Sequence, residues 1–243
     1  MEFDIAFYLL LPVIAFLYAS VGHGGASGYL ALMALFNAQT AVMKPAALLL
    51  NLFIAGVSFL MYFRSGHFRW KLFYPFALTS IPAAFIGGYI QLDADIYKII
   101  LAIFLFFSVL KLMGWIGVES SENQNPSMYI SLLAGFAIGF TSGLIGIGGG
   151  IILSPIILIF HWANMKETAA VSALFIWINS LSGLSGYMFS GSQIPAGAYL
   201  LVLIALIGGL LGAYVGSTKL NSIVLQRMLA FVLLIAGIKL LLT

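Results

Sequence analysis

The chain has 243 residues, of which 63% are hydrophobic and only 7% are charged, and its mean hydropathy is +1.13. A soluble domain carries about 25% charged residues because its surface faces water, so lipid is the solvent that this composition fits. Ten Lys and Arg against seven Asp and Glu give a net charge of +3, too small a basic surplus for a nucleic-acid footprint. The absence of cysteine from the sequence excludes disulfides, thiolate metal sites and cysteine nucleophiles.

Ten apolar segments follow one another along the chain. A membrane helix needs about 20 apolar residues to cross the hydrocarbon core, and eight runs approach or reach that length. They lie at residues 5–21, 41–63, 72–92, 96–116, 129–145, 168–189, 196–215 and 223–242. The first run follows acidic residues without a basic region or cleavage site, so we expect a retained span. Two shorter runs, residues 25–36 and 150–160, come directly after glycine clusters and are predicted to be half-helices.

The positions of the basic residues favour one arrangement of these segments. If all ten cross the bilayer and the N-terminus lies outside, seven of the ten Lys and Arg lie on the cytoplasmic side, and Lys44, Lys98 and Lys239 lie outside. If instead the two short segments re-enter without crossing, the basic residues divide five against five. Because cytoplasmic loops carry an excess of Lys and Arg, we expect the first arrangement.

The two halves of the chain resemble each other. The sequence VGHGG at residues 21–25 aligns with IGIGG at residues 145–149, and Asn51 aligns with Asn179. An ordered series of such matches at a nearly constant offset indicates an internal repeat. We therefore predict a first transmembrane repeat at residues 1–116, a polar linker at residues 117–127 and a second transmembrane repeat at residues 128–243.

Each half holds five segments, and an odd number inverts the second half relative to the first. Inverted repeats with interrupted helices are typical of secondary transporters, which hold their substrate near the midplane. The predicted fold class is an all-α polytopic membrane protein with two homologous halves. These halves are expected to be inverted-topology repeats of about five segments each, four long helices plus one half-helix after a glycine-rich break.

The two glycine clusters, residues 22–28 and 143–150, are the strongest candidates for a binding site. Glycine lets the backbone turn sharply and leaves its amides open to a ligand. A helix that starts there directs free N–H groups and the positive end of its dipole into the cluster. Two such ends would bind an anion without a buried formal charge. The alternative is that the glycines only permit close helix packing.

His23 is an ionisable residue beside the first cluster, where the second half has Ile147. Burying an unpaired ionisable residue in the membrane is costly, so such a residue is a functional candidate by default. His23 is a candidate to donate a hydrogen bond to an anion or to carry a coupled proton near neutral pH. The alternative is an interfacial histidine that water or a carbonyl satisfies.

Small polar side chains lie in or beside the same segments. Asn51 and Asn179, within apolar runs, can offer donors to a substrate oxygen or bond a neighbouring helix. The hydroxyls that flank the clusters are predicted to complete the hydrogen bonds of the anion, or else to bond their own helix. These hydroxyl residues are Ser27, Thr141 and Ser142.

Lys44 precedes Pro45 at the expected start of a span, and the second half has Ser172 at the aligned position. Proline is favoured in the first helical turn, so Lys44 is expected to mark the start of a helix. Its ammonium is predicted either to snorkel to the interface or to guide anions inward. Lys239 is expected to snorkel.

Several classes of chemistry have no candidate residues. The sequence shows neither a catalytic triad nor a carboxylate pair, and no carboxylate lies deep in a span to relay protons. The histidine spacing fits no metal motif. We therefore expect neither an enzyme nor a metal site.

The glycine segments VGHGGASGYLALMAL and GFTSGLIGIGGGIILSPIIL, one in each half, carry a family resemblance. The chain resembles the TauE/SafE family of sulfite and organosulfonate exporters, also called the TSUP family, over nearly its whole length. The resemblance implies transport of sulfur-containing anions such as sulfite, thiosulfate or sulfoacetate, by a protein of about eight helices in a bacterial inner membrane. Because His23 and Ser27 stand opposite Ile147 and Ile151, the two clusters are not expected to bind substrate equally.

The function hypothesis that these features support is a secondary transporter, with a small oxyanion bound between two glycine hairpins around which the halves rock. The backbone amides around Gly24, Gly25, Gly148 and Gly149 are expected to supply most of the hydrogen bonds. The expected partners are the anion, the lipid bilayer and, as a candidate coupling ion, the proton. No nucleic acid or cofactor is expected, and the oligomeric state is left open. A passive anion channel and a non-transporting membrane scaffold are the alternatives.

Overall fold

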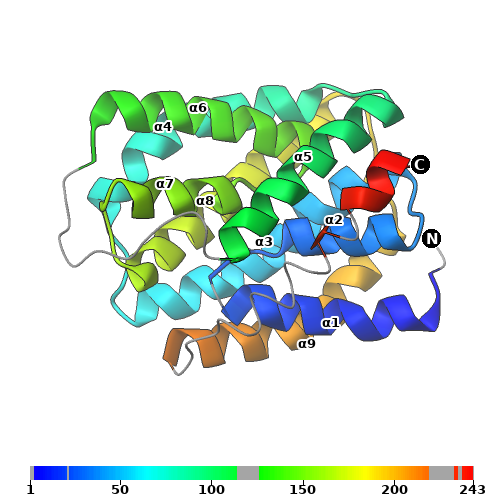
Figure 1. Ribbon diagram of the computed structural model, residues 1–243, viewed down its shortest axis with the longest axis horizontal. Coiled ribbons are helices and arrows are strands. Elements are labelled where there is room, and N and C mark those ends of the chain that lie inside the picture. Colours follow the sequence, from blue (N-terminus) through cyan, green and yellow to red (C-terminus); the bar gives the residue numbers. More distant parts are fainter. Residues whose placement is uncertain (1–2, 21, 114–125, 219–232, 235–236, 243) are drawn as a thin grey trace.

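The structure is a computed structural model that describes residues 3–20, 22–113, 126–218, 233–234 and 237–242. Nine helices occupy most of these residues, and the short stretches near the C-terminus are helical as well (Figure 1). The nine are α1 (Ile5–Ser20), α2 (Ala26–Leu35), α3 (Thr40–Arg64), α4 (Trp70–Tyr89), α5 (Ala94–Leu112), α6 (Met128–Ile145), α7 (Gly150–Ile159), α8 (Met165–Phe189) and α9 (Gly197–Thr218). The described residues contain no strand, so the prediction of an all-α polytopic protein is confirmed.

Among the described helices, five are long and apolar enough to cross a membrane: α3, α4, α6, α8 and α9. Of the other expected spans, α1 has 16 residues, and α5 has 19 but includes Asp95, Lys98 and Lys111. The predicted span at residues 223–242 and the linker at residues 117–127 lie largely outside the described residues. At 1.5 Å per residue, the 10-residue helices α2 and α7 extend about 15 Å, half of the roughly 30 Å hydrocarbon core.

Six long helices form two groups of three, and within each group the helices run parallel. In the first group, α4 packs against α6 and α8, and in the second, α9 packs against α1 and α3. Glycines that recur every four residues let the backbones touch, as small residues do in membranes. On α6 they are Gly135, Gly139 and Gly143, which face Phe76, Ser80 and Ala84 of α4; on α9 they are Gly208, Gly212 and Gly216, which face Pro12, Phe16 and Ser20 of α1.

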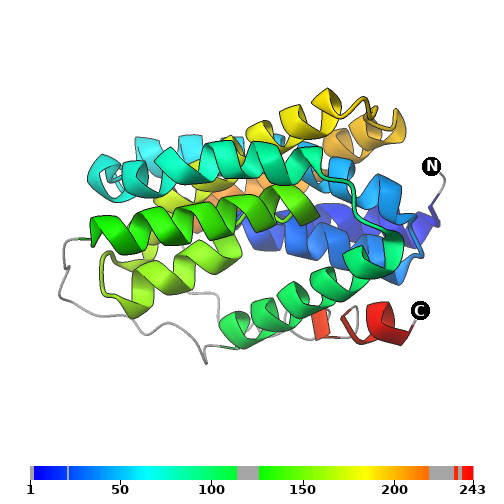
Figure 2. The same cartoon turned by 90° about the horizontal axis from the view of Figure 1, so that it is seen from above.

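The two groups run in opposite directions and meet where α3 crosses α8. Gly56 in the second half of α3 lies against Trp177 of α8, whereas Leu48, nearer the start of α3, lies against Gly183, nearer the end of α8. The long helices share one axis of the molecule (Figures 1 and 2). The inverted repeat itself stays a prediction. The first helices of the two predicted halves, α1 and α6, run in opposite directions, which favours it.

The half-helix α2 returns to the end of the bundle from which α1 starts. The ring of Phe36, directly after α2, lies 5.5 Å from the ring of Phe7 near the start of α1. Both ends of the chain lie at this end of the bundle, which we call the N-terminal end (Figure 1). The second hairpin, α6–α7, enters from the opposite end, where Arg69 Nη1 donates to the carbonyl of Trp162 just beyond α7 (2.8 Å).

Each described loop therefore lies on the same side as in the predicted arrangement in which all ten segments cross the bilayer. The half-helices α2 and α7, however, each cover only about half the thickness of the hydrocarbon core. Arg64, Arg69, Lys71 and Lys166 lie in or next to the connections at the opposite end, and Lys44 and Lys98 lie in the first two turns of α3 and α5 at the N-terminal end. By the excess of Lys and Arg in cytoplasmic loops, we expect the opposite end to face the cytoplasm.

We expect Gly139→Val to destabilise the protein, because its side chain would be driven into the backbone of Ser80, where α6 touches α4. Overpacking of this kind costs about 1–3 kcal/mol, so the Tm of the detergent-solubilised protein should fall by several degrees. Leu133→Val, on the exposed face of the same helix, is the matched control and should leave the Tm unchanged. Equal Tm values for the two variants would contradict the close packing of α4 and α6.

Candidate functional site

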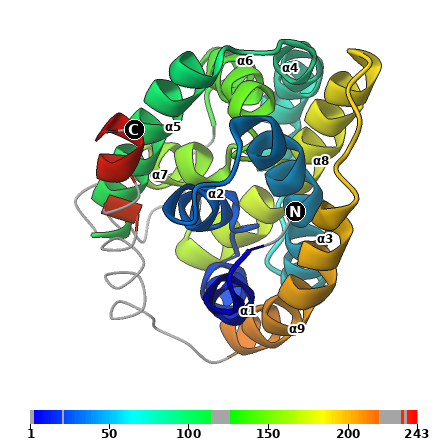
Figure 3. The ribbon, with the colours of Figure 1, turned by 90° about the vertical axis from the view of Figure 1, so that its right-hand side faces the viewer.

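The two glycine hairpins meet at the centre of the bundle. Viewed along the bundle, α2 and α7 lie inside a ring of longer helices (Figure 3). A Cβ placed on Gly24 would lie 2.7 Å from Asn51 Oδ1, and one on Gly148 would lie 2.5 Å from Asn51 Nδ2. The same two positions would lie 2.8 Å and 2.7 Å from the side chain of Ile176. Asn51 of α3 and Ile176 of α8 therefore lie between the hairpin tips.

Both half-helices start at this meeting point without a side-chain cap. The residues before their first turns, Gly25 and Gly149, have φ values of 95° and 78°, and Gly148 has 74°. Only glycine adopts such backbone readily. The first N–H groups of a helix have no partner within the helix, and successive N–H groups in a turn form a concave nest that suits an anion. Both glycine turns lie beside Asn51.

Asn51 is fully buried, and neither atom of its amide has a partner among the described residues. Asn179, its aligned counterpart, donates Nδ2 to the carbonyl of Phe175 (2.8 Å) but leaves Oδ1 unpaired. Burying an uncompensated amide costs about 1–3 kcal/mol. The two aligned asparagines therefore differ, and Asn51 is the one whose hydrogen-bonding capacity is wholly open to a ligand.

Two buried hydroxyls near the second hairpin also lack a partner in the described structure. Ser142 Cβ lies 3.5 Å from the position a Cβ would take on Gly149, and Ser180 Oγ lies 3.3 Å from the one on Gly148. Ser142 was a predicted site residue. Ser180 was not selected in the sequence analysis, although its position directly after the candidate Asn179 could have pointed to it.

His23 takes part in a hydrogen-bond chain that joins the first hairpin to the second. Its Nε2 lies 3.0 Å from Ser154 Oγ of α7, which in turn lies 2.9 Å from Ser172 Oγ of α8. Ser154 donates its own proton to the carbonyl of Gly150 (2.7 Å), so it accepts from its other two partners. In this arrangement His23 Nε2 carries a proton. Ser154 was not selected in the sequence analysis, because it lies within an apolar run next to Pro155.

Two predicted site residues turn away from the hairpin tips. Ser27 Oγ donates to the hydroxyl of Tyr18 within its own hairpin (2.9 Å). Thr141 Oγ1 bonds the carbonyls of Ala137 (2.9 Å) and Ile138 (3.1 Å) of its own helix. Thr141 therefore follows the alternative in which a hydroxyl bonds its own helix.

Lys44 does not snorkel into water, which was the first of its two predicted alternatives. The residue is 6% exposed, and α3 begins at Thr40, one turn earlier than its position before Pro45 suggested. Its Nζ donates to three carbonyls at the C-terminal end of α4: Gly87 (3.2 Å), Gly88 (2.8 Å) and Ile90 (2.8 Å). Cations are favourable at this end of a helix.

Lys239 also differs from the prediction, because its ammonium contacts protein. Its Nζ donates to the carbonyl of Leu35, the last residue of α2 (2.7 Å), and the side chain is partly buried. A lysine therefore caps the C-terminal end of the first half-helix.

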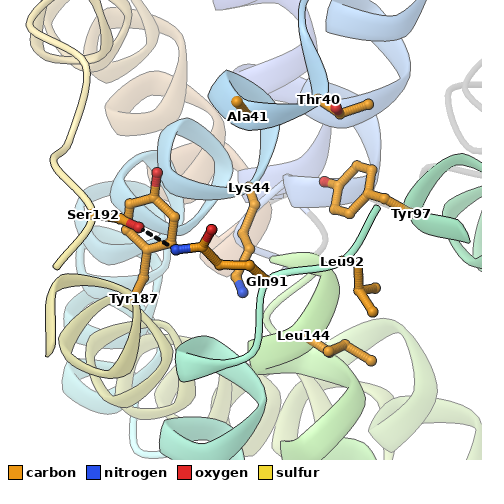
Figure 4. Close-up of a pocket in the computed structure, with 9 residues that line it drawn as sticks. All are labelled: Thr40, Ala41, Lys44, Gln91, Leu92, Tyr97, Leu144, Tyr187 and Ser192. Atoms are coloured by element: carbon orange, nitrogen blue, oxygen red, sulfur yellow. Dashed lines mark hydrogen bonds between the residues drawn. The ribbon is translucent and has the colours of Figure 1, made fainter. Parts of the chain in front are cut away.

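A pocket of about 140 Å³ lies at the N-terminal end of the bundle and not between the hairpin tips, where Asn51 and Ile176 fill the space. The side chain of Lys44 extends toward its centre (Figure 4). The lining residues are Thr40, Ala41, Lys44, Gln91, Leu92, Tyr97, Leu144, Tyr187 and Ser192. Gln91 Nε2 donates to Ser192 Oγ across one side of it (2.7 Å). Within the described residues, no group of three or more His, Asp or Glu is placed to hold a metal ion.

This geometry defines a multi-pass helical membrane protein with two hairpins, each of which contains a half-helix. The hairpins meet at their tips, where the half-helices begin. Residues 7–240 match the family described as Sulfite exporter TauE/SafE. The chain belongs to this family of membrane transporters.

Related proteins are also named as membrane transporters. The chain is 35% identical over 234 residues to the probable membrane transporter protein y4hK of Sinorhizobium fredii, and the match covers 94% of each chain. It is 26% identical over 214 residues to the probable membrane transporter protein YunE of Bacillus subtilis, which covers 80% of this chain and 78% of the relative. No solved structure gives a significant match.

We expect Asn51→Leu to stabilise the protein in the absence of substrate. The change removes a buried amide without partners, which is worth about 1–3 kcal/mol, and keeps a side chain of similar size. Asn179→Leu is the matched control and should gain less, because it also removes the bond to the Phe175 carbonyl. Thermal unfolding in detergent without added anion measures both. A lower Tm for Asn51→Leu than for the parent would show that the amide of Asn51 is satisfied within the protein.

Proposed function

We propose that the chain is a secondary transporter of small anions, with sulfur oxyanions and organosulfonates of the sulfite, thiosulfate and sulfoacetate type as its substrate class. The observation that carries the proposal is the convergence of two uncapped half-helix N-termini on the unpartnered amide of Asn51. The preference for an anion rests on these helix ends. The sulfur chemistry rests on the description of the family.

The charge at the hairpin tips suits a small anion. Each helix N-terminus is equivalent to about half a positive charge, so two give roughly one unit without an ionised side chain. The buried polar residues of the described chain include no Asp or Glu that would repel an anion. Amides near Gly24, Gly25, Gly148 and Gly149 would donate to its oxygens, with the Asn51 amide beside them.

Alternating access is the mechanism that we propose for this site. The two groups of three helices run in opposite directions, as inverted repeats would, and such repeats rock around a fixed central site. The pocket around Lys44 lies at the N-terminal end of the bundle, while Asn51 and Ile176 fill the space at the hairpin tips. This closed centre favours a carrier over an open channel. A scaffold would not need a buried amide without partners.

We propose the inner membrane of a bacterium as the location, with the end that carries Arg64 and Arg69 in the cytoplasm. Protons are the proposed coupling ion, with His23 as their carrier. The chain of His23, Ser154 and Ser172 supports this role, because it links the titratable residue of one hairpin to the half-helix of the other.

Gly25→Val and Gly149→Val are expected to abolish the flux of radiolabelled sulfite into proteoliposomes while membrane insertion persists. A side chain at either position would strain the backbone and collide with Tyr29 or Ile138, whose atoms lie 2.6 Å from the added Cβ. The matched control is Gly66→Val, at a φ of 77° with no atom within 4 Å of the added Cβ.

The control carries the same backbone strain away from the site, so it should transport at the parent rate. Parental flux in both hairpin variants would contradict the proposed site. Saturable flux that accelerates when unlabelled sulfite is present on the far side distinguishes a carrier from a channel, which would show an uncoupled conductance.

His23→Gln tests proton coupling. Glutamine can still donate to Ser154 Oγ, but it cannot titrate near neutral pH as histidine does. We expect this variant to keep sulfite flux and to lose its acceleration by a pH gradient. The measurement is flux with and without an imposed gradient, and Ser185→Ala on the exposed face of α8 serves as the control. A pH-gradient response equal to that of the parent would exclude His23 as the proton carrier.

A further inference from the structure

Lys44 is a buried cation without a carboxylate partner. The ion pair that the described residues do contain joins Arg69 and Glu167 at the other end of the bundle (3.5 Å). Asp93 and Asp95, the acidic residues nearest in sequence to the pocket lining, are exposed and form no ion pair with Lys44. A buried charge is costly unless it is compensated. The C-terminal end of α4 supplies part of that compensation.

The remaining charge faces the pocket. A helix C-terminus is equivalent to about half a negative charge, so the α4 end compensates only part of the ammonium charge, and the ring of Tyr187, whose centroid lies 5.7 Å from Nζ, adds a cation–π contact. The hydroxyls of Thr40 and Tyr187 line the same pocket and have no hydrogen-bond partner among the described residues. Figure 4 shows Lys44, Gln91 and Tyr187 around one space. The pocket volume of about 140 Å³ exceeds the ~30 Å³ share of one liquid water several times, which is room for a small oxyanion.

The second hairpin forms part of the pocket wall. Leu144, at the end of α6, lines the pocket, and the hydroxyl of Tyr97 donates to the carbonyl of the next residue, Ile145 (2.9 Å). Gly146 follows, and a Cβ there would lie 3.0 Å from the Lys44 carbonyl oxygen. An anion in the pocket would therefore lie next to the end of α6, where the turn to the tip of the second hairpin begins.

The other half of the chain has no cation at the aligned position. Ser172 stands there, fully buried, and its hydroxyl bonds Ser154. A cationic pocket of this kind therefore belongs to the N-terminal end of the bundle. Lys44 is the fifth residue of α3, about 6 Å along the helix axis from its start at 1.5 Å per residue. Asn51 lies seven residues further along α3, about 10 Å deeper at 1.5 Å per residue, so the pocket and the hairpin tips are at different levels.

We infer that the pocket around Lys44 is a second anion-binding site, which the transported anion occupies on its way between the N-terminal end of the bundle and the hairpin tips. The inference rests on the proposed function. The site takes a small oxyanion, whose charge Lys44 compensates and whose oxygens accept from Tyr187, Thr40 and the ammonium. It makes the two faces of the transporter unequal in apparent affinity.

The test measures sulfite flux separately from each face of proteoliposomes. Because the sequence contains no cysteine, Ser65→Cys at the exposed turn after α3 reports orientation by reaction with an impermeant thiol reagent. In this background, Lys44→Gln is expected to raise the KM for sulfite at the pocket face about tenfold, the usual loss for a hydrogen bond to a charged group. The KM at the opposite face should not change.

Lys71→Gln, an exposed cation at the start of α4, is the matched control and should leave both KM values unchanged. Lys44→Arg keeps the positive charge but changes its geometry, so it should raise the KM at the pocket face less than Lys44→Gln does. Because Lys44 also caps α4, Ala41→Phe is a second variant that fills the exposed mouth of the pocket and leaves the cap intact. It too should raise the KM at the pocket face alone.

Equal KM changes at both faces, or a parental KM in both Lys44→Gln and Ala41→Phe, would overturn the inference. With flux lost in Gly25→Val and Gly149→Val, that outcome would leave the proposed central site in place. Normal flux in the two glycine variants would instead remove the proposed function, whatever the pocket variants show.

Discussion

The structure depends on how backbone amides are satisfied in lipid. Within a bilayer, a peptide N–H without a partner costs several kcal/mol, so irregular backbone is tolerated only where protein buries it or a cavity solvates it. Here α2 and α7 begin at the centre of the bundle after glycine turns, without side-chain caps. The turn glycines Gly24 and Gly148 lie beside the fully buried Asn51, whose amide lacks partners in the described chain. The hairpin tips are therefore the place where a ligand has most to contribute.

The long helices hold the hairpins by close backbone contact. Glycines at every fourth residue bring α6 onto α4 and α9 onto α1, and α3 and α8 then enclose the tips through Asn51 and Ile176. Such contacts resist small shifts, because any added atom meets a carbonyl. Between the two groups, α3 meets α8 through side chains, with Trp177 against Gly56 and Leu48 against Gly183. The alternating access proposed above would place its motion at this junction.

The helix ends give the molecule its polarity. Lys44 caps α4 near one end of the bundle, whereas its aligned residue Ser172 bonds Ser154 in the chain that reaches His23 between the hairpins. The aligned positions of the two halves therefore carry a cation in one and a hydroxyl in the other. This difference makes the electrostatic surroundings of the two hairpins unequal.

The sequence by itself determined what local composition controls. It indicated a helical membrane protein, the two half-helices and the glycine turns before them, because hydrophobic length and glycine act within a few residues. It also selected Asn51, whose amide in an apolar run signals a polar contact. Tertiary structure decided which polar groups meet: Ser154 and Ser180 join the site, Ser27 and Thr141 turn to their own hairpins, and Lys44 caps a helix 43 residues away. These outcomes depend on how distant helices pack, and spacing along one helix carries no record of its neighbours.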